Sequence, residues 1–296
     1  MYKRIKSEFL YQIKKRLDSK IINYLILDHL VVLPSGHRLP QFQELYPQYD
    51  KYFYNFIMEL SRSFEYFIFI DIGANVGDTT VAVLSLAENA KAVCVEGNSD
   101  YINFLKTNVA IFDSRVKIHA RFLESQRIKG MGYISNRSTG QFSRKESSSE
   151  VPFITVDEIL VGSKSELYIW KSDIDGLDLP IFLENKALIC EYAKIIWMEI
   201  EPDLFPTRSE DVYSFLEFLR TSDFHGSLFD NFGECVGSGT GAEVADLVIN
   251  NLPQSRKLTN RFRNAPSYFD LIIVHASIGD SRLLSDLLRS LADTVK

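Results

Sequence analysis

An acidic residue and two glycines stand where a predicted strand passes into a predicted helix. Residues 66–70 are apolar or aromatic, Asp71 follows them, and Gly73 and Gly77 precede an apolar helical pattern that starts at Val81. The apolar run is typical of a strand buried on both faces of a parallel sheet. A glycine has no Cβ, so a ligand can approach the backbone there and the helix can pack close to the strand. Strand, acid, glycine turn and helix in this order predict a nucleoside-cofactor pocket at the carboxyl edge of the sheet.

A second acidic residue follows the next predicted strand. Residues 92–95 are apolar and lead into Glu96, Gly97 and Asn98. A carboxylate at the tip of this strand suits bidentate acceptance of hydrogen bonds from two ribose hydroxyls. The residues expected to bind the cofactor are Asp71, Gly73, Asn75, Gly77, Asp78, Glu96, Asn98 and Phe122.

The spacing of the glycines indicates which nucleoside cofactor is bound. A dinucleotide fingerprint has the form Gly-x-Gly-x-x-Gly, and its middle glycine makes room for a pyrophosphate. Asn75 stands at that middle position, and Asp71 lies two residues before the first glycine. A carboxylate there would repel a pyrophosphate but suits an ammonium group, directly or through water. The predicted cofactor is S-adenosylmethionine, which has one adenosine, an amino-acid tail and no phosphate. The alternative interpretation is that Asp71 and the glycines form an ordinary strand-to-helix turn in another doubly wound protein.

Composition and cysteine usage indicate a globular protein of a reducing compartment. The chain has 296 residues, of which 46% are hydrophobic and 24% charged, as in soluble globular proteins. Its three cysteines form no Cys-x-x-Cys pair, which argues against a zinc site or a disulfide framework. The apolar run at 21–33 is interrupted by polar residues and is too short to span a bilayer. A cytoplasmic location is therefore expected.

The first twenty residues are basic, whereas the rest of the chain is acidic. They carry seven lysines and arginines against two acids, a net charge of +5, which leaves −11 for the remainder because the total is −6. Apolar residues recur every fourth position from Ile5 to Ile21, which predicts an amphipathic helix with a basic outer face. A solvated face is the simpler interpretation, and peripheral contact with an anionic membrane or a phosphate-bearing substrate is the alternative. The acidic body gives no support for nucleic-acid binding.

The order of predicted elements divides the chain at about residue 62. Residues 1–62 are expected to form an N-terminal helical extension, helical to about Leu30 and again over 49–60, with a connector at 34–40 between them. Residues 63–296 are expected to form the cofactor-binding domain, in which strands alternate with helices. The predicted strands are 66–71, 91–96, 116–123, 167–173 and 194–200, followed by an antiparallel pair at 227–232 and 268–275. This alternation predicts an α/β, doubly wound, mostly parallel sheet with helices on both faces.

A third motif ends the fourth predicted strand. It reads Lys171-Ser-Asp173-Ile-Asp175-Gly176-Leu-Asp178, and the next strand ends in Glu199. Together with the Asp71–Gly77 turn and Glu96, it resembles the FkbM-type S-adenosylmethionine-dependent methyltransferases over residues 66–202. Asp175 and Asp178 stand where that family usually has glutamates. The resemblance implies a class I methyltransferase (Rossmann-like) fold, with a seven-stranded sheet whose last strand is antiparallel. It also implies O-methylation of a hydroxyl, often on a glycan or natural product.

The third motif also has a chemistry of its own. Lys171 and Asp173 point to the same side of their strand, and Asp173 at the strand tip could take up the proton that the acceptor hydroxyl loses. Asp173 and Asp175 could together hold a divalent cation, although no metal-ligand set is assigned. The alternative is that Asp173 caps the turn, Lys171 pairs with it, and catalysis relies on positioning. The residues predicted to be catalytic are Asp173, Lys171 and, as the one candidate histidine, His37.

Three classes of function remain open at the level of sequence. The first is a methyltransferase that acts on a small-molecule or glycan acceptor. A nicotinamide-dependent oxidoreductase is disfavoured by Asn75, which occupies the position of a pyrophosphate glycine. A non-catalytic binding module on a methyltransferase fold is disfavoured by the complete set of Asp71, Gly73, Gly77 and Glu96.

Overall fold

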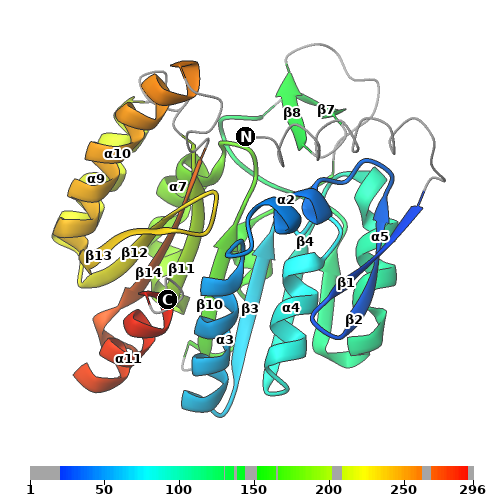
Figure 1. The fold of residues 1–296 in the computed structure, drawn as a ribbon, viewed down its shortest axis with the longest axis horizontal. Helices are drawn as coiled ribbons and strands as arrows, with labels where there is room; N and C mark the ends of the chain where they lie inside the picture. Colours follow the sequence, from blue (N-terminus) through cyan, green and yellow to red (C-terminus); the bar gives the residue numbers. More distant parts are fainter. Residues whose placement is uncertain are drawn as a thin grey trace.

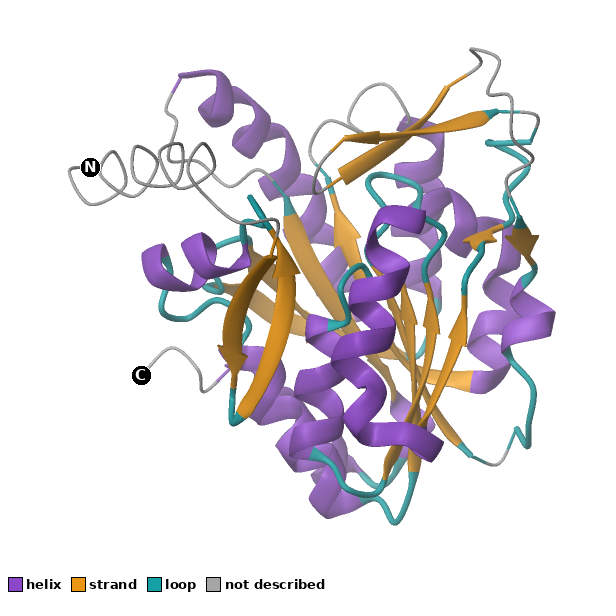
Figure 2. Cartoon of the chain, turned by 90° about the vertical axis from the view of Figure 1, so that its right-hand side faces the viewer, coloured by secondary structure: helices purple, strands orange, loops and turns teal. Residues whose placement is uncertain are grey.

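An eight-stranded sheet forms the centre of the chain, with helices on both of its faces (Figures 1 and 2). The computed structural model describes residues 21–129, 131–136, 139–143, 152–164, 166–201, 209–261 and 268–292. The order of strands across the sheet is β13-β12-β14-β11-β10-β3-β4-β5. Their bounds are β3 Phe67–Ile72, β4 Ala90–Val95, β5 Val116–His119, β10 Leu167–Ser172, β11 Ala193–Ile200, β12 Phe224–Asp230, β13 Cys235–Thr240 and β14 Phe269–His275.

Side chains alternate between two hydrophobic cores, one on each face of the sheet. Phe67 and Phe69 of β3 face one core, whereas Ile68, Ile70 and Ile72 face the other. Every residue of β3 and of β10 is buried, because both faces of these central strands are covered. The helices on the first face are α3 (Lys51–Ser63), α4 (Asp78–Leu86), α5 (Ser99–Val109) and α11 (Ser281–Ala292); those on the second are α6 (Val156–Ile159), α7 (Asp178–Tyr192), α9 (Ser209–Thr221) and α10 (Gly241–Arg261).

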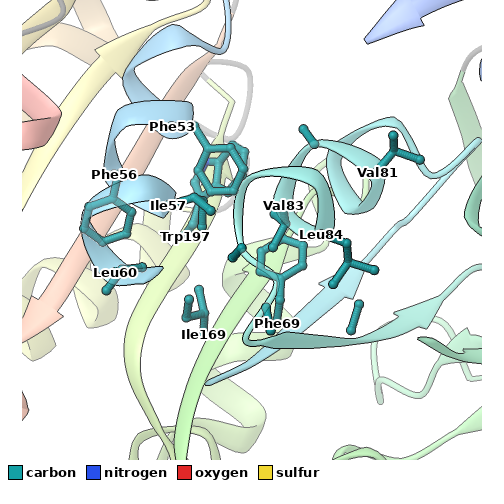
Figure 3. Close-up of a cluster of buried hydrophobic side chains, with 14 of the residues drawn as sticks. Phe53, Phe56, Ile57, Leu60, Phe69, Val81, Val83, Leu84, Ile169 and Trp197 are labelled. Atoms are coloured by element: carbon teal, nitrogen blue, oxygen red, sulfur yellow. The ribbon is translucent and has the colours of Figure 1, made fainter. Parts of the chain in front are cut away.

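Aromatic contacts join α3 to the middle of the sheet. Phe53 of α3 lies with its ring centroid 4.2 Å from that of Trp197 on β11, within the buried cluster drawn in Figure 3. Tyr52 stacks on Phe229 of β12 with a centroid distance of 4.0 Å. The predicted N-terminal segment therefore shares one core with the rest of the sheet, and Ile26, Val31, Leu33 and Leu39 ahead of α3 belong to the same core.

The strand order confirms the doubly wound α/β prediction and adds one strand. Seven strands form the expected sheet, in which β14 is antiparallel to both β11 and β12, as predicted for the 227–232 and 268–275 pair. The eighth strand, β13, pairs antiparallel with β12 at the edge of the sheet. Helices α9 and α10 and strand β13 are not among the elements expected from the sequence.

The prediction of a helix up to Leu30 is wrong for residues 21–30. Strands β1 (Ile21–Ile26) and β2 (His29–Pro34) instead form an antiparallel hairpin, whose two-residue turn places Leu27 at a φ of +51°. Cross-strand pairs of branched side chains, such as Ile22 with Leu33, stabilise the hairpin. The helical spacing that includes Ile21 therefore does not produce a helix here. The predicted basic helix of residues 1–20 lies outside the described residues, and so membrane contact through it stays a prediction.

Two short strand pairs stand beside the main sheet. The predicted strand at 116–123 is divided into β5 and β6 (Phe122–Leu123), and β6 pairs with β9 (Phe153–Ile154). Part of the segment expected to be irregular forms a second hairpin from β7 (Gly132–Asn136) and β8 (Thr139–Ser143), drawn at the top of Figure 1. The short helices are α2 (Leu39–Leu45), η1 (Ala110–Arg115) and η2 (Ala276–Ile278). Within the described ranges, no helix is both long and apolar enough to cross a membrane.

Candidate active site

A pocket of about 370 Å³ opens at the carboxyl ends of β3, β4 and β10. This is the edge at which ligands bind in open α/β sheets. Among the residues predicted to form the site, Gly73, Asn75, Glu96, Phe122 and Asp173 line the pocket. They come from four separate segments of the sequence, which the sheet brings to one edge.

Close packing explains both glycines of the turn after β3. Gly73 has a φ of +77°, and a Cβ there would lie 2.1 Å from the carbonyl oxygen of Asp173. Gly77 has a φ of +83°, and a Cβ there would lie 2.7 Å from Leu105 Cδ1 on α5. Gly73 therefore permits contact with the end of β10, whereas Gly77, which does not line the pocket, permits the packing of α4 against α5.

Glu96 is held at the pocket by two backbone amides. Its Oε2 accepts a hydrogen bond from the Asn75 amide at 2.8 Å, and its Oε1 accepts one from the Asn98 amide at 2.6 Å. Burial raises the pKa of Glu96, and these two hydrogen bonds oppose the rise. Each carboxylate oxygen can accept a second hydrogen bond, so the geometry allows the predicted acceptance from two ribose hydroxyls.

Asn98 has a structural contact of its own. Its side chain accepts a hydrogen bond from the Asp100 amide at 3.0 Å and so caps the amino end of α5. It is not among the residues that line the pocket. Its backbone amide donates to Glu96, and its side chain hydrogen-bonds with Tyr133, which lines the pocket.

Asp71 lies beneath the pocket and not in its wall. Its side chain is fully buried, with Oδ1 2.9 Å from Lys171 Nζ. Its Oδ2 accepts a hydrogen bond from the hydroxyl of Thr80 at 2.7 Å. Both oxygens therefore contact other residues of the protein, and Asp71 is absent from the residues that line the pocket.

Lys171 connects Asp71 to Asp173. Its ammonium is almost fully buried and lies 3.7 Å from Asp173 Oδ2. Burial disfavours the charged form, but Asp71 and then Asp173 outweigh it and raise the pKa of Lys171. Lys171 is therefore cationic, and among the residues predicted to be catalytic Asp173 is the one that lines the pocket, with its carboxylate half exposed.

His37 and Asp78 lie close to each other but outside the pocket lining. His37 is in the connector between β2 and α2, where its Nδ1 accepts a hydrogen bond from the Leu39 amide at 3.4 Å. Burial lowers the pKa of His37, although the charge of Asp78 acts in the opposite direction. Burial likewise raises the pKa of Asp78, and His37 opposes it. The fold thus brings the predicted histidine to the start of α4, beside the glycine turn.

Two further carboxylates belong to this edge of the sheet. Glu199 of β11 and Asp270 of β14 stand directly opposite each other in the antiparallel pair. Tyr52 and Trp197 donate hydrogen bonds to Asp270 at 3.0 and 3.1 Å. Burial, followed by the charge of Asp173, raises the pKa of Asp270 to about 7 and that of Glu199 well above its ordinary value. The sequence places Glu199 at a strand tip, but only the pairing of β11 with β14 shows that Asp270 faces it.

Tyr133 is a pocket residue for which the sequence has no signal. It belongs to β7, in a segment expected to be irregular, and its ring centroid lies 4.5 Å from that of Phe122.

Among the described residues, no group of three or more His, Cys, Asp or Glu side chains is arranged to hold a metal ion.

No protein-family model and no curated protein sequence matches the chain. A proposed O-methyltransferase from Klebsiella pneumoniae is similar to it at 12% identity, with a TM-score of 0.42 over 80% of this chain and 90% of that chain. TYW2 from P. horikoshii, in complex with MeSAdo, is 10% identical, with a TM-score of 0.41 over 86% and 70%. The plantazolicin methyltransferase BpumL, in complex with SAH, is 10% identical, with a TM-score of 0.38 over 80% and 88%. Because each of these TM-scores is below 0.5, we base the function on the geometry of the pocket.

Proposed function

We propose that the chain is an S-adenosylmethionine-dependent methyltransferase of the FkbM type that O-methylates a hydroxyl group of a glycan or related biosynthetic intermediate. The observation that carries the proposal is the position of Glu96. Its carboxylate is oriented by the Asn75 and Asn98 amides and lines a pocket at the carboxyl edge of the sheet. A carboxylate fixed in this way matches the two neighbouring hydroxyls of a ribose.

The size and walls of the pocket favour one nucleoside over two. A volume of about 370 Å³ is at the lower end of the range for ligand pockets, and a dinucleotide has two nucleotide units to place. The two arginines that line the pocket each have a carboxylate nearby, since Arg127 pairs with Asp211 at 2.6 Å and Arg121 lies 4.0 Å from Glu158. These features support S-adenosylmethionine over a nicotinamide dinucleotide.

Residues at the ends of β10 and β11 would act on the hydroxyl compound that accepts the methyl group. S-adenosylmethionine supplies an electrophilic methyl group, which an aligned hydroxyl oxygen can attack. Asp173, half exposed at the pocket, can accept the proton of that hydroxyl, while Lys171 holds a compensating charge 3.7 Å away. Glu199 of β11 lies at the same edge of the sheet outside the pocket lining, where a part of the acceptor that extends beyond the pocket would meet it.

Calorimetry with three ligands tests the choice of cofactor. We expect S-adenosylmethionine and S-adenosylhomocysteine to bind with micromolar affinity, about −8 kcal/mol, and NAD to show no saturable binding. Glu96→Ala should weaken S-adenosylhomocysteine binding by about 2–3 kcal/mol, because two charge-assisted hydrogen bonds are lost. Tight NAD binding without a signal for S-adenosylhomocysteine would contradict the proposal.

A transfer assay tests the reaction itself. The protein is incubated with methyl-labelled S-adenosylmethionine and a panel of glycan precursors, and mass spectrometry locates the label. A labelled oxygen on a sugar supports O-methylation. Cofactor binding with no transfer to any member of the panel, nor to a panel of small natural-product phenols and alcohols, would favour the non-catalytic binding module.

A further inference from the structure

The β7–β8 hairpin contributes a side chain to the candidate cofactor pocket. Met131, which precedes β7, and Tyr133 within β7 both line the pocket. Tyr133 pairs with Phe142 of β8 in the hairpin register. The carboxyl edge of the sheet, where the pocket opens, faces this hairpin at the top of Figure 1. A pocket residue thus comes from a segment outside the eight-stranded sheet.

Phe122 packs flat against the backbone at the tip of β4. A Cβ at Gly97 would lie 2.2–2.4 Å from three carbons of the Phe122 ring, so the ring occupies the space that any other residue at position 97 would need. The Tyr133 ring follows it, with the centroids 4.5 Å apart and the planes inclined at 45°. Gly97, Phe122 and Tyr133 therefore form one aromatic wall directly beside Glu96.

The polar end of Tyr133 lies near the carboxylates of the pocket. Burial raises the pKa of the Tyr133 hydroxyl, and the charges of Glu96 and then Asp175 raise it further. The ring is half buried, so part of its surface remains accessible from the pocket. An apolar aromatic wall that ends in a hydroxyl beside the Glu96 carboxylate suits adenosine, which has an aromatic base and two sugar hydroxyls.

We infer that Tyr133 is a cofactor-binding residue, which packs with Phe122 against the adenosine half of S-adenosylmethionine. The inference rests on the proposed function, since it assigns a further contact to the same cofactor. Through this contact, the affinity for the cofactor would depend on the β7–β8 hairpin as well as on the glycine turn. We assign the contact to adenosine because the wall adjoins Glu96 at the tip of β4, whereas Asp173 directly follows β10.

Two ligands and three variants test the inference by calorimetry. The ligands are S-adenosylhomocysteine and methylthioadenosine, which share the adenosine half but differ in the amino-acid tail. Tyr133→Ala should weaken both by the same factor, about tenfold, as expected when a base loses an aromatic partner. Tyr133→Phe should weaken both about two- to threefold, because only the hydroxyl is removed. The matched control is Tyr66→Ala, a tyrosine that precedes β3 at the opposite edge of the sheet, and it should leave both affinities unchanged.

The two ligands separate failure of the inference from failure of the proposed function. If the wild-type protein binds both ligands but Tyr133→Ala changes neither affinity, the assignment of Tyr133 is wrong and the proposed function stands. A loss confined to S-adenosylhomocysteine would place Tyr133 at the amino-acid tail and would also overturn the inference. If the wild-type protein binds neither ligand, both the inference and the proposed function are wrong. Circular dichroism of each variant confirms that the fold is retained.

Discussion

At the scale of single residues, the pair Asp71–Lys171 has the strongest consequences for the site. The two residues are direct neighbours in the parallel register of β3 and β10, and both side chains are buried. The sequence suggested that Asp71 would face the ammonium group of the cofactor. In the structure its oxygens contact Lys171 and Thr80, so Asp71 stabilises the floor of the pocket. Removal of the Asp71 charge is costly because the buried lysine is then left with only the more distant, half-exposed Asp173, 3.7 Å away.

We therefore expect Asp71→Asn to lower the free energy of unfolding by about 3–5 kcal/mol. The double variant Asp71→Asn/Lys171→Met removes both charges at similar volume and should recover most of that loss. Urea unfolding followed by circular dichroism measures both effects. A double variant that is as unstable as Asp71→Asn would show that the loss of stability does not come from the lysine charge that has lost Asp71.

Asp173 is the second residue for which a substitution is decisive. Asp173→Asn should lower turnover by about a hundredfold or more, because the half-exposed carboxylate at the pocket can no longer accept a proton. Its affinity for S-adenosylhomocysteine should change little. The matched control is Asp157→Asn, an exposed carboxylate in the first turn of α6 that does not line the pocket, which should retain nearly full activity. Turnover near the wild-type level in Asp173→Asn would leave positioning as the main catalytic device.

At the scale of elements, one buried asparagine joins three segments. The Asn108 side chain on α5 accepts a hydrogen bond from the Val32 amide at 2.7 Å. Its Nδ2 donates to the carbonyls of Val32 and Val76 at 2.9 and 2.8 Å. Asn108 thus ties β2 of the β1–β2 hairpin to the glycine turn that precedes α4.

Asn108→Ala should lower the free energy of unfolding by about 2–3 kcal/mol, since three hydrogen bonds are lost and the backbone groups of Val32 and Val76 lose their side-chain partner. It should also weaken S-adenosylhomocysteine binding several-fold, because Val76 lies in the glycine turn. The control is Asn103→Ala, on the exposed side of the same helix. Equal stability of the two variants in urea would contradict the role assigned to Asn108.

At the scale of the whole molecule, the fold brings residues from distant parts of the chain to the carboxylates Glu199 and Asp270. Asp270 is bonded by Tyr52, 218 residues earlier in the sequence, and it faces Glu199 across the β11–β14 pair. Two carboxylates directly opposite each other repel when both are ionised. Burial, followed by the charge of Asp173, raises the pKa of both carboxyl groups, to about 7 for Asp270.

The contribution of Asp270 to stability should therefore depend on pH. Its folded-state pKa lies above the ordinary value of about 4, so the folded protein binds this proton more tightly than the unfolded chain does. The free energy of unfolding should fall as pH rises from about 4 to about 7, and Asp270→Asn should show a shallower fall. Thermal unfolding between pH 4 and pH 8 measures both slopes, with Glu210→Gln on the exposed start of α9 as the control. Parallel curves for wild type and Asp270→Asn would refute this account.

Features that depend on local patterns can be predicted from the amino-acid sequence. Apolar runs identify β3, β10 and β11, and the glycines after Asp71 identify the turn that leads into α4, because burial and backbone conformation leave marks within a few neighbouring residues. The alternation of strands and helices was sufficient for a doubly wound sheet with its carboxyl edge as the binding edge. Glu96 and Phe122, predicted to bind the cofactor, and Asp173, predicted to be catalytic, all line the pocket, and their roles stay predictions.

Which of these side chains contact each other can be seen only in the tertiary structure. Lys171 is a hundred positions from Asp71, and nothing in either motif shows that register pairs them. The same holds for Asn108 with Val32, for Tyr52 with Asp270, and for Tyr133 beside Phe122. The β1–β2 hairpin was predicted as a helix because apolar spacing in a short run fits both conformations, and the choice depends on pairing with another segment. Contacts between distant segments follow from packing of the whole chain, which no local pattern encodes.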